Sequence, residues 1–403
     1  MDIINTISQK LSDIQLIGQF VGWLHSWIHD YGLTVIIFTC FLKLATLPLD
    51  FWQRYSMKKS SALQEELKPQ MLKIDKQFAN DQQRAMQEKQ KINKKYGVSF
   101  ASGCLPLIVT MAVFMFMFTG LSAYSSYSSN VLYNTLVKSY NTAYCETYLP
   151  SDITKDKEEI AKIEIQIKDT NKLLKSAQEA GDEEKVELLA KEIVTITALK
   201  KEKTALKNKR EAQAGANGSA AVSKTFDEKR EGFLWVKNIY LPDTWVKVFP
   251  SYYDATKTGG NGQGIDKTKV TPENYKIIEE AVMKSKAGKG YFGANWNGLL
   301  LLPLLSIGLS LLSSFIAQKM NVAKNATVDP QTAKTNKIMM FVTPLIFAFF
   351  VFQYTSAFGV YMVANSIMTI LLGLIINPIT DKIAMRKVSE KFDSLKPTYS
   401  RKK

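Results

Sequence analysis

The chain has 403 residues, 46% of them hydrophobic and 22% charged, with a formal net charge of +15 at pH 7. By length alone it could hold two or three soluble domains. Its apolar residues instead lie in blocks, and its lysines lie beside those blocks or in a long stretch of alternating sign. This distribution argues against direct nucleic-acid readout and points to a membrane surface. Three cysteines and two histidines offer no disulfide framework or metal-ligand spacing, so we expect no metal and no cofactor.

Residues 1–31 carry apolar side chains every three or four positions, from Ile3 to Ile28, which predicts an amphipathic helix. Trp23 and Trp27 suit the headgroup level of a bilayer, so we interpret this helix as interfacial. It has no basic segment followed by a small-residue cleavage site, so we expect no secretory signal peptide.

Residues 32–50 are predicted to form the first transmembrane helix, with Lys43 in its middle. A charged side chain at that depth costs about 3 kcal/mol on insertion scales. Lys43 could snorkel to an interface, but that reach is about 10 Å along the helix. The depth favours a cavity or bundle interior around Lys43.

Residues 51–96 hold eleven basic and five acidic residues with helical periodicity, interrupted at Pro69 and at the Asn80-Asp81 pair. We expect a helical hairpin here, and its positive excess places it in the cytoplasm. A second transmembrane helix, rich in methionine and phenylalanine, follows at 104–123.

Residues 124–296 are predicted to lie outside the membrane, on the extracytoplasmic side. Acids and lysines alternate over 153–212, and apolar residues recur on both halves around Ala180-Gly181-Asp182, which predicts an antiparallel coiled-coil hairpin. The low-complexity stretch 212–221 is expected to be a flexible linker. Residues 232–243 suit a segment folded onto the bilayer surface, and the pattern of 244–296 predicts no particular structure.

Residues 297–378 contain transmembrane helices three to five, and a basic cytoplasmic tail follows at 379–403. The three segments assigned to the cytoplasm are 51–96, 318–337 and 381–403. Together they hold 23 basic and 9 acidic residues, which places the N-terminus outside and the C-terminus inside. The predicted fold is therefore an all-α membrane protein with five spans, a cytoplasmic hairpin and an inserted extracytoplasmic coiled-coil hairpin. The apolar blocks that define the spans are 33–49, 105–123, 299–317, 338–353 and 358–377.

Several ordered motifs resemble the YidC/Oxa/Alb family of membrane protein insertases. Residues 35–49, VIIFTCFLKLATLPL, are similar to a core helix in which a basic residue precedes a proline by five positions; the family usually has arginine where Lys43 stands. Residues 103–114, GCLPLIVTMAVF, resemble the second-span motif, with Thr110 where many members have glutamine. Similar pieces follow in the expected order: 233–243, Asp329-Pro330, Pro344 and 361–365. The resemblance does not cover the coiled-coil arm or 244–296.

The resemblance implies a groove between the spans that opens to the cytoplasm and to lipid and is closed on the outer side. Such a groove could hydrate Lys43, with Asn365 as the second residue of interest. The other polar candidates on the spans are each as readily explained by helix packing: Thr39, Thr110, Ser310, Ser313, Thr343 and Tyr361.

These features favour a non-enzymatic insertase in a bacterial plasma membrane, which moves hydrophobic segments of nascent proteins from the cytoplasm into the lipid bilayer without nucleotide hydrolysis. The chain has no Gly-Lys-Ser/Thr phosphate loop. Nascent membrane proteins and lipid are the expected partners, and the resemblance adds the ribosome and the Sec translocon as candidates. One alternative is a secondary transporter or channel that uses Lys43 as an ion or proton site. The odd number of spans and the lack of a visible inverted repeat argue against it. The other alternative is a scaffold protein built around the arm.

Overall fold

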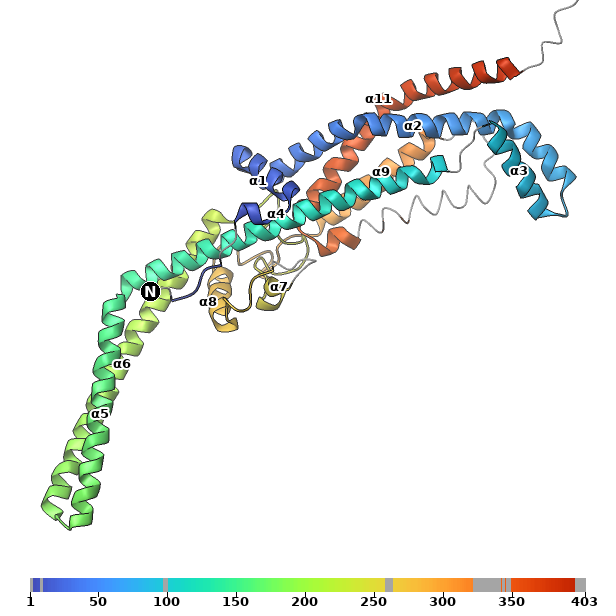
Figure 1. The fold of residues 1–403 in the computed structure, drawn as a ribbon. Coiled ribbons are helices and arrows are strands. Elements are labelled where there is room, and N and C mark those ends of the chain that lie inside the picture. Colours follow the sequence, from blue (N-terminus) through green and yellow to red (C-terminus); the bar gives the residue numbers. More distant parts are fainter. Residues whose placement is uncertain are drawn as a thin grey trace, which may run out of the picture.

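The computed structural model describes residues 3–7, 10–96, 101–257, 264–321, 342, 345 and 349–395, with side chains omitted for 101–110, 317–321 and 393–395. Regular structure in these ranges is helical apart from isolated bridges. Helix labels follow Figure 1.

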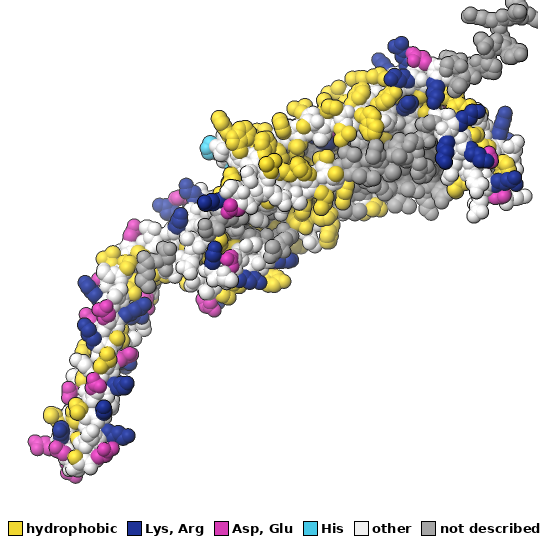
Figure 2. Space-filling view, in the orientation of Figure 1, with side chains coloured by type: hydrophobic (Ala, Val, Ile, Leu, Met, Phe, Trp, Pro, Cys, Tyr) yellow, Lys and Arg dark blue, Asp and Glu magenta, His cyan; other side chains and the backbone are white. Residues whose placement is uncertain are grey.

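A bundle of long helices forms the body of the molecule (Figure 1). It contains α2 (Tyr31–Gln77), α4 (Ala101–Thr147), α9 (Leu301–Asn321) and α11 (Ser356–Leu395). Asp30 fixes the start of α2 because its carboxylate accepts a hydrogen bond from the Leu33 amide at 2.8 Å. Exposed apolar side chains gather over this bundle, whereas the arm carries mixed charges (Figure 2). The bundle is thus the part of the chain suited to lipid.

Two helices of the described chain are long and apolar enough to cross a membrane, namely α2 and residues 356–392 of α11. The described part of α9 adds a shorter apolar helix, Leu301–Ile316. The predicted span 338–353 lies largely outside the described residues, as do the side chains of 105–110. The five-span count therefore stays a prediction.

The N-terminal segment differs from the helix predicted over 1–31. A 3-10 turn (Leu11–Asp13) and α1 (Leu16–Ile28) are present, but residues 3–7 are not helical. Asn141 of α4 bonds both the amide (3.0 Å) and the carbonyl (2.8 Å) of Ile4, which competes with helix formation. Side-chain partners on α4 thus hold this segment in a non-helical conformation, and Ile4 and Ile7 are buried there.

The predicted hairpin at 51–96 consists of the end of α2 and of α3 (Gln82–Tyr96), with the turn at 78–81. Lys89 and Asp75 form an ion pair at 2.6 Å across it. Pro69 lies inside α2 and does not interrupt it, contrary to expectation. Proline disfavours helix formation locally, but the surrounding helix is long enough to continue through it.

The arm is a helical hairpin of α5 (Pro150–Ala180) and α6 (Glu183–Lys229) (Figure 1). The turn lies at the predicted position, where Gly181 takes φ 73° and Asp182 caps α6 through the Lys185 amide. Ion pairs Lys200–Glu164 (2.9 Å) and Lys203–Glu159 (2.8 Å) join the helices and show that they are antiparallel. Their supercoiling stays a prediction.

The flexible linker predicted at 212–221 is wrong, because α6 runs through it without a break. Its small residues are the surface that packs against α4. A Cβ atom on Gly218 would lie 2.8 Å from the Tyr140 ring, so the glycine lets the two helices approach closely. Ala214 and Val222 are buried in the same contact. The composition that predicted flexibility instead allows close helix packing.

Asp156 ties the base of the arm together. It accepts a hydrogen bond from Tyr148 Oη at 2.6 Å and pairs with Arg210 at 2.9 Å. These two contacts, Tyr148 first, hold the pKa of Asp156 below its ordinary value. A carboxylate with a lowered pKa stabilises the fold above its unfolded pKa of about 4, and this contribution is lost as the pH falls through the lower folded value.

We expect Asp156→Asn to increase hydrogen exchange at the base of the arm at pH 7, where the wild-type side chain is charged. At an acidic pH below the lowered folded pKa of Asp156 the two proteins should converge, because the wild-type side chain has then lost the charge that the variant lacks. Exchange measured by mass spectrometry over 148–156 and 207–214 tests this. An equal difference at both pH values would show that the charge on Asp156 is unimportant.

A second core lies where the arm meets the bundle. It combines α4 and α6 with α7 (Tyr252–Thr256) and α8 (Pro272–Met283), so residues 244–296 are a folded insertion. Tyr275 is fully buried in it and donates to the Pro250 carbonyl at 2.9 Å. The insertion therefore has its own packed interior against α4 and α6.

Candidate functional site

A row of polar and charged side chains follows one face of α2 through its apolar part. Lys43, Asp50, Arg54 and Lys58 are spaced by seven, four and four residues, which places them on one side of a helix. Lys43 Nζ lies 3.7 Å from Asp50 Oδ2, and the Lys43 side chain is 18% exposed. A pair at 3.7 Å is longer than a good hydrogen bond. Lys43 is thus neutralised by Asp50 on its own helix without being tightly bound to it.

The same face of α2 makes polar contacts with α11. Arg54 Nη1 donates to Asn377 Oδ1 at 2.9 Å, and Lys58 Nζ pairs with Asp381 Oδ1 at 2.8 Å. Gly373 gives Arg54 room, since a Cβ atom there would lie 3.3 Å from the guanidinium. We call Lys43, Asp50, Arg54, Lys58, Asn377 and Asp381 the polar ladder.

The ladder also sets the register of the two helices. Asn377 and Asp381 each lie 323 positions after their partner on α2, so α2 and α11 run parallel. Lys43 lies about three turns before Arg54. Carried back along both helices, the same offset pairs Lys43 with residue 366, next to Asn365.

The other predicted site residues are not gathered around Lys43 by any described contact. Thr39 is buried and its hydroxyl bonds the Val35 carbonyl of its own helix at 2.7 Å. Tyr361 is buried beside Phe358, with ring centroids 5.9 Å apart. These two side chains therefore have packing roles in the structure.

The remaining candidates are less defined. Asn365 is half-buried, and its carbonyl accepts from Thr369 at 2.7 Å. Ser310 and Ser313 are half-buried on α9. The Thr110 side chain and Thr343 lie outside the described residues. A groove role for these residues stays a prediction.

The sequence analysis singled out only Lys43 of the polar ladder and missed its other members, which are Asp50, Arg54, Lys58, Asn377 and Asp381. Asp50 and Arg54 follow Lys43 by seven and eleven positions, and this spacing is the signal that could have revealed them. Asn377 has no such signal, because its pairing depends on the register of a helix more than three hundred residues away.

One segment, residues 231–243, joins the first turns of three helices; we call it the clamp. The Glu231 carboxylate accepts from the Tyr31 amide at the start of α2 at 3.1 Å. The Leu241 carbonyl accepts from the amide and the hydroxyl of Ser356 at the start of α11, at 2.8 and 2.6 Å. The same end of both helices is therefore closed by one piece of chain.

Asp243 attaches the clamp to α9. Its buried carboxylate accepts from the amides of Leu299 (2.7 Å), Leu300 (3.2 Å) and Leu302 (2.6 Å), and from Trp235 Nε1 (2.8 Å). An anion at this position satisfies free amides at a helix start and complements the helix dipole. Asp243 thus joins the clamp to the third helix.

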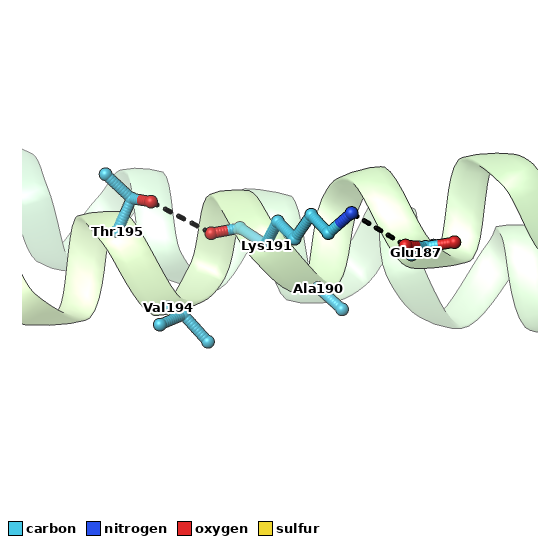
Figure 3. Close-up of a pocket in the computed structure, with 5 residues that line it drawn as sticks. All are labelled: Glu187, Ala190, Lys191, Val194 and Thr195. Carbon is cyan, nitrogen blue, oxygen red and sulfur yellow. Dashed lines mark hydrogen bonds and ion pairs between the residues drawn. The ribbon is translucent and has the colours of Figure 1, made fainter.

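A shallow hollow on the arm carries no site. Figure 3 shows its lining, which comes from α6 alone, with the Lys191–Glu187 ion pair at 2.6 Å along the helix. An exposed ion pair within one helix brings no side chains from other elements together, and such pairs contribute little energy.

Apolar helices that expose their side chains, joined by a polar ladder within and a clamp at one end, define a helical membrane protein. The chain belongs to the family described as 60Kd inner membrane protein, the YidC/Oxa/Alb family, whose model matches residues 23–188 and 219–383. The match spans the bundle, the clamp, part of the arm and the insertion 244–296, so it is wider than the resemblance of the sequence motifs, which did not cover the arm or the insertion.

Individual relatives are similar over shorter stretches. The chain is 37% identical over 103 residues to the membrane protein insertase YidC of Chlorobaculum parvum, which covers 26% of this chain and 17% of that protein. It is 27% identical over 113 residues to the protein of that name from Caldanaerobacter subterraneus, a stretch that covers 28% of this chain and 53% of that protein. It is 37% identical over 95 residues to the membrane protein insertase YidC of Leptospira interrogans, a stretch that covers 24% of this chain and 14% of that protein. The matched stretch is thus about a seventh to a half of each relative's length.

Proposed function

We propose that this chain is a membrane protein insertase that moves hydrophobic segments of nascent proteins from the cytoplasm into the bilayer. Family membership and the printed name of its relatives support the class. The observation that carries the mechanism is Lys43, a cation inside an apolar helix whose described ion partner, Asp50, lies at 3.7 Å.

The proposed working part is a wet groove at the level of Lys43 and Asn365, within a bundle of five spans. The clamp supports a closed outer end, since it bonds the first turns of α2, α9 and α11. Beyond the clamp, Phe41, Leu44, Leu371 and Leu374 are exposed on α2 and α11. A bundle closed at one end and apolar on its outside further along fits a groove that opens to the cytoplasm and to lipid.

In this mechanism the polar flank of the cargo enters the groove, and an acidic side chain in it takes the place of Asp50 beside Lys43. The weak existing pair makes the exchange favourable, because a cargo carboxylate at hydrogen-bond distance would gain more than the 3.7 Å contact gives. Partitioning of the cargo's apolar segment into lipid then drives insertion, at a few tenths of a kcal/mol per Leu or Ile residue. No nucleotide is required.

The proposed orientation in the bacterial plasma membrane follows the charge pattern. The α2–α3 hairpin and the basic tail lie in the cytoplasm, and the N-terminus, clamp and arm lie outside. The hairpin and tail are the surfaces on which a ribosome would meet the protein. The Sec translocon remains a candidate partner implied by the resemblance.

The direct test is insertion by the purified chain in proteoliposomes. An acid-tailed single-span cargo should become protected from added protease without nucleotide, and empty liposomes should give no protection. Protection that needs ATP or GTP would contradict the mechanism. Solute flux in the absence of cargo would instead favour the transporter or channel.

Shortening the arm separates insertion from scaffolding. We expect a chain in which residues 161–201 are replaced by a short Gly-Ser turn to keep cargo insertion within about twofold of the full chain. This cut leaves the ion pairs Lys203–Glu159 and Arg210–Asp156 at the base intact, so the bundle should fold unchanged. Complete loss of insertion by a folded short-arm protein would make the arm part of the machinery.

A further inference from the structure

Two tight turns beside the bundle have a large apolar residue at the tip. A bridge between Phe233 and Val236 closes the first turn, and one between Tyr291 and Ala294 closes the second. The tip residues are Leu234, which is 71% exposed, and Phe292, which is 89% exposed. Neither side chain belongs to the hydrophobic cores of the described structure.

Both tip residues also have left-handed backbone conformations, with φ 54° at each. Glycine and asparagine adopt this conformation readily, whereas bulky side chains are disfavoured there. In a turn facing water, Leu234 and Phe292 would combine this backbone cost with two exposed apolar side chains. An apolar environment outside the protein would offset both costs.

The two turns belong to one surface. Tyr291 donates a hydrogen bond from its hydroxyl to the Trp235 carbonyl, and Lys237 Nζ lies 4.5 Å from the centre of the Tyr291 ring. Trp245, which is 62% exposed, packs near Trp296 with ring centroids 5.7 Å apart. We call Leu234 and Phe292 the turn tips.

This surface lies at the end of the bundle where the apolar helices begin. A Cβ atom on Gly32 would meet the Phe233 ring, so the first turn packs on the start of α2. Just after the second turn α9 starts at Leu301, and its side chains Leu301 and Leu304 are exposed. The turn tips are therefore continuous with the surface that would face lipid acyl chains.

The charges around the tips fit a bilayer interface. Residues 284–300 contain three lysines and no acidic residue. Lys284, Lys286 and Lys289 are all exposed. Tryptophan and lysine next to apolar residues suit the boundary between headgroups and acyl chains. A protein partner would leave this basic flank unexplained, whereas anionic headgroups complement it.

We propose that the turn tips insert into the headgroup and acyl boundary of the leaflet at the clamp end of the bundle. The tips hold the clamp against lipid, and the clamp in turn holds the starts of α2, α9 and α11. This anchoring requires that the bundle spans a membrane, and it holds whether or not the chain is an insertase.

The test uses single-cysteine variants labelled with an environment-sensitive fluorophore in full-length protein. Cys40, Cys104 and Cys145 are first replaced by serine or alanine. Leu234→Cys and Phe292→Cys then report on the tips, and Val194→Cys, 69% exposed on the arm, is the matched control. The protein is reconstituted into vesicles of phosphatidylcholine with phosphatidylglycerol that carry a nitroxide near the top of the acyl chain.

The nitroxide should quench the two tip labels at least about twofold more strongly than the label at 194, since a side chain at this boundary lies within roughly 10 Å of it. Moving the nitroxide to the end of the acyl chain should reduce the quenching. Quenching at 234 and 292 equal to that at 194 would overturn the proposal. Shielding of the tips from a water-soluble quencher without lipid quenching would also overturn it, by assigning the tips to a protein contact.

A second measurement tests whether the native side chains at 234 and 292, rather than attached labels, cause the insertion. Leu234→Asn and Phe292→Asn remove the apolar side chains, and asparagine tolerates the left-handed backbone conformation, so the fold should be retained. In the variant that carries both asparagine substitutions, a label attached at Trp245→Cys should lose at least about half of its quenching by the lipid nitroxide. The reason is that the apolar side chains at 234 and 292 no longer anchor the surface. Unchanged quenching at 245 would contradict a joint role for the tips.

Discussion

Lys43→Glu is expected to reduce insertion of an acid-tailed single-span cargo at least about tenfold. At 4 Å and an effective dielectric constant near 20, two unit charges interact by about 4 kcal/mol, so reversal of the charge turns a favourable contact into a repulsive one of similar size. The introduced carboxylate would also face Asp50, which already lies on the same side of α2. Lys43→Ala should show a smaller loss, and Lys43→Arg should stay within about twofold because the charge is kept.

Two controls locate the effect. Arg54→Gln removes a positive charge from the same face of α2, but Arg54 bonds Asn377, so this change should alter helix packing more than the response to acidic cargo. A cargo with a neutral tail should be inserted at similar rates by the unmodified chain and by the Lys43→Glu variant. The measurement is protease protection of the cargo in proteoliposomes at equal amounts of folded insertase. Equal insertion of acid-tailed cargo by the unmodified chain and by the Lys43→Ala and Lys43→Glu variants would disprove the electrostatic mechanism.

Asp50 provides the complementary test within the same prediction. Asp50→Asn keeps Lys43 but removes its described ion partner. If cargo carboxylates displace Asp50, this variant should insert acid-tailed cargo at least as fast as the unmodified chain. A loss as large as that of Lys43→Glu would instead show that the intact Lys43–Asp50 pair is what the mechanism needs.

Local patterns in the sequence predicted the elements whose structure is set by nearby residues. The turn at Gly181 and Asp182 was found because a left-handed glycine and a capping aspartate act within a few residues. Lys43 could be singled out because one charge in an apolar block is visible without knowledge of the fold, and its role in a groove stays a prediction. Such signals need no information about distant parts of the chain.

The features that were missed depend on distant contacts. Asp243 accepts a hydrogen bond from the amide of Leu299, which lies 56 residues later in the chain. Nothing in the sequence around Asp243 marks it as the cap of a later helix. Residues 212–221 looked flexible because they are small, yet Gly218 is small so that Tyr140 can pack on it. Composition describes what a segment could do alone, and tertiary packing decides which of those properties is used.

Asp243→Ala is expected to destabilise the clamp end of the bundle by about 3 to 5 kcal/mol. The substitution removes the acceptor of the buried Leu302 amide and of three partly buried donors, the amides of Leu299 and Leu300 and the indole of Trp235. Each buried donor without a partner costs about 1 to 3 kcal/mol, although water entering the site would reduce the total.

Asp243→Asn separates the two parts of this effect. The amide keeps one acceptor oxygen but brings an NH₂ group toward donors that already point at the site, so the loss should be only partly relieved. Asp266→Ala is the control, because Asp266 lies in the adjoining insertion, 244–296, but bonds its own neighbour Thr268 at an exposed turn. Thermal unfolding in detergent should place the midpoint of Asp243→Ala well below that of Asp266→Ala, with Asp243→Asn between them. If Asp243→Ala unfolds at the same midpoint as Asp266→Ala, the contacts of Glu231 to α2 and of Leu241 to α11 are enough to hold the clamp, and the starts of the helices do not depend on the Asp243 carboxylate.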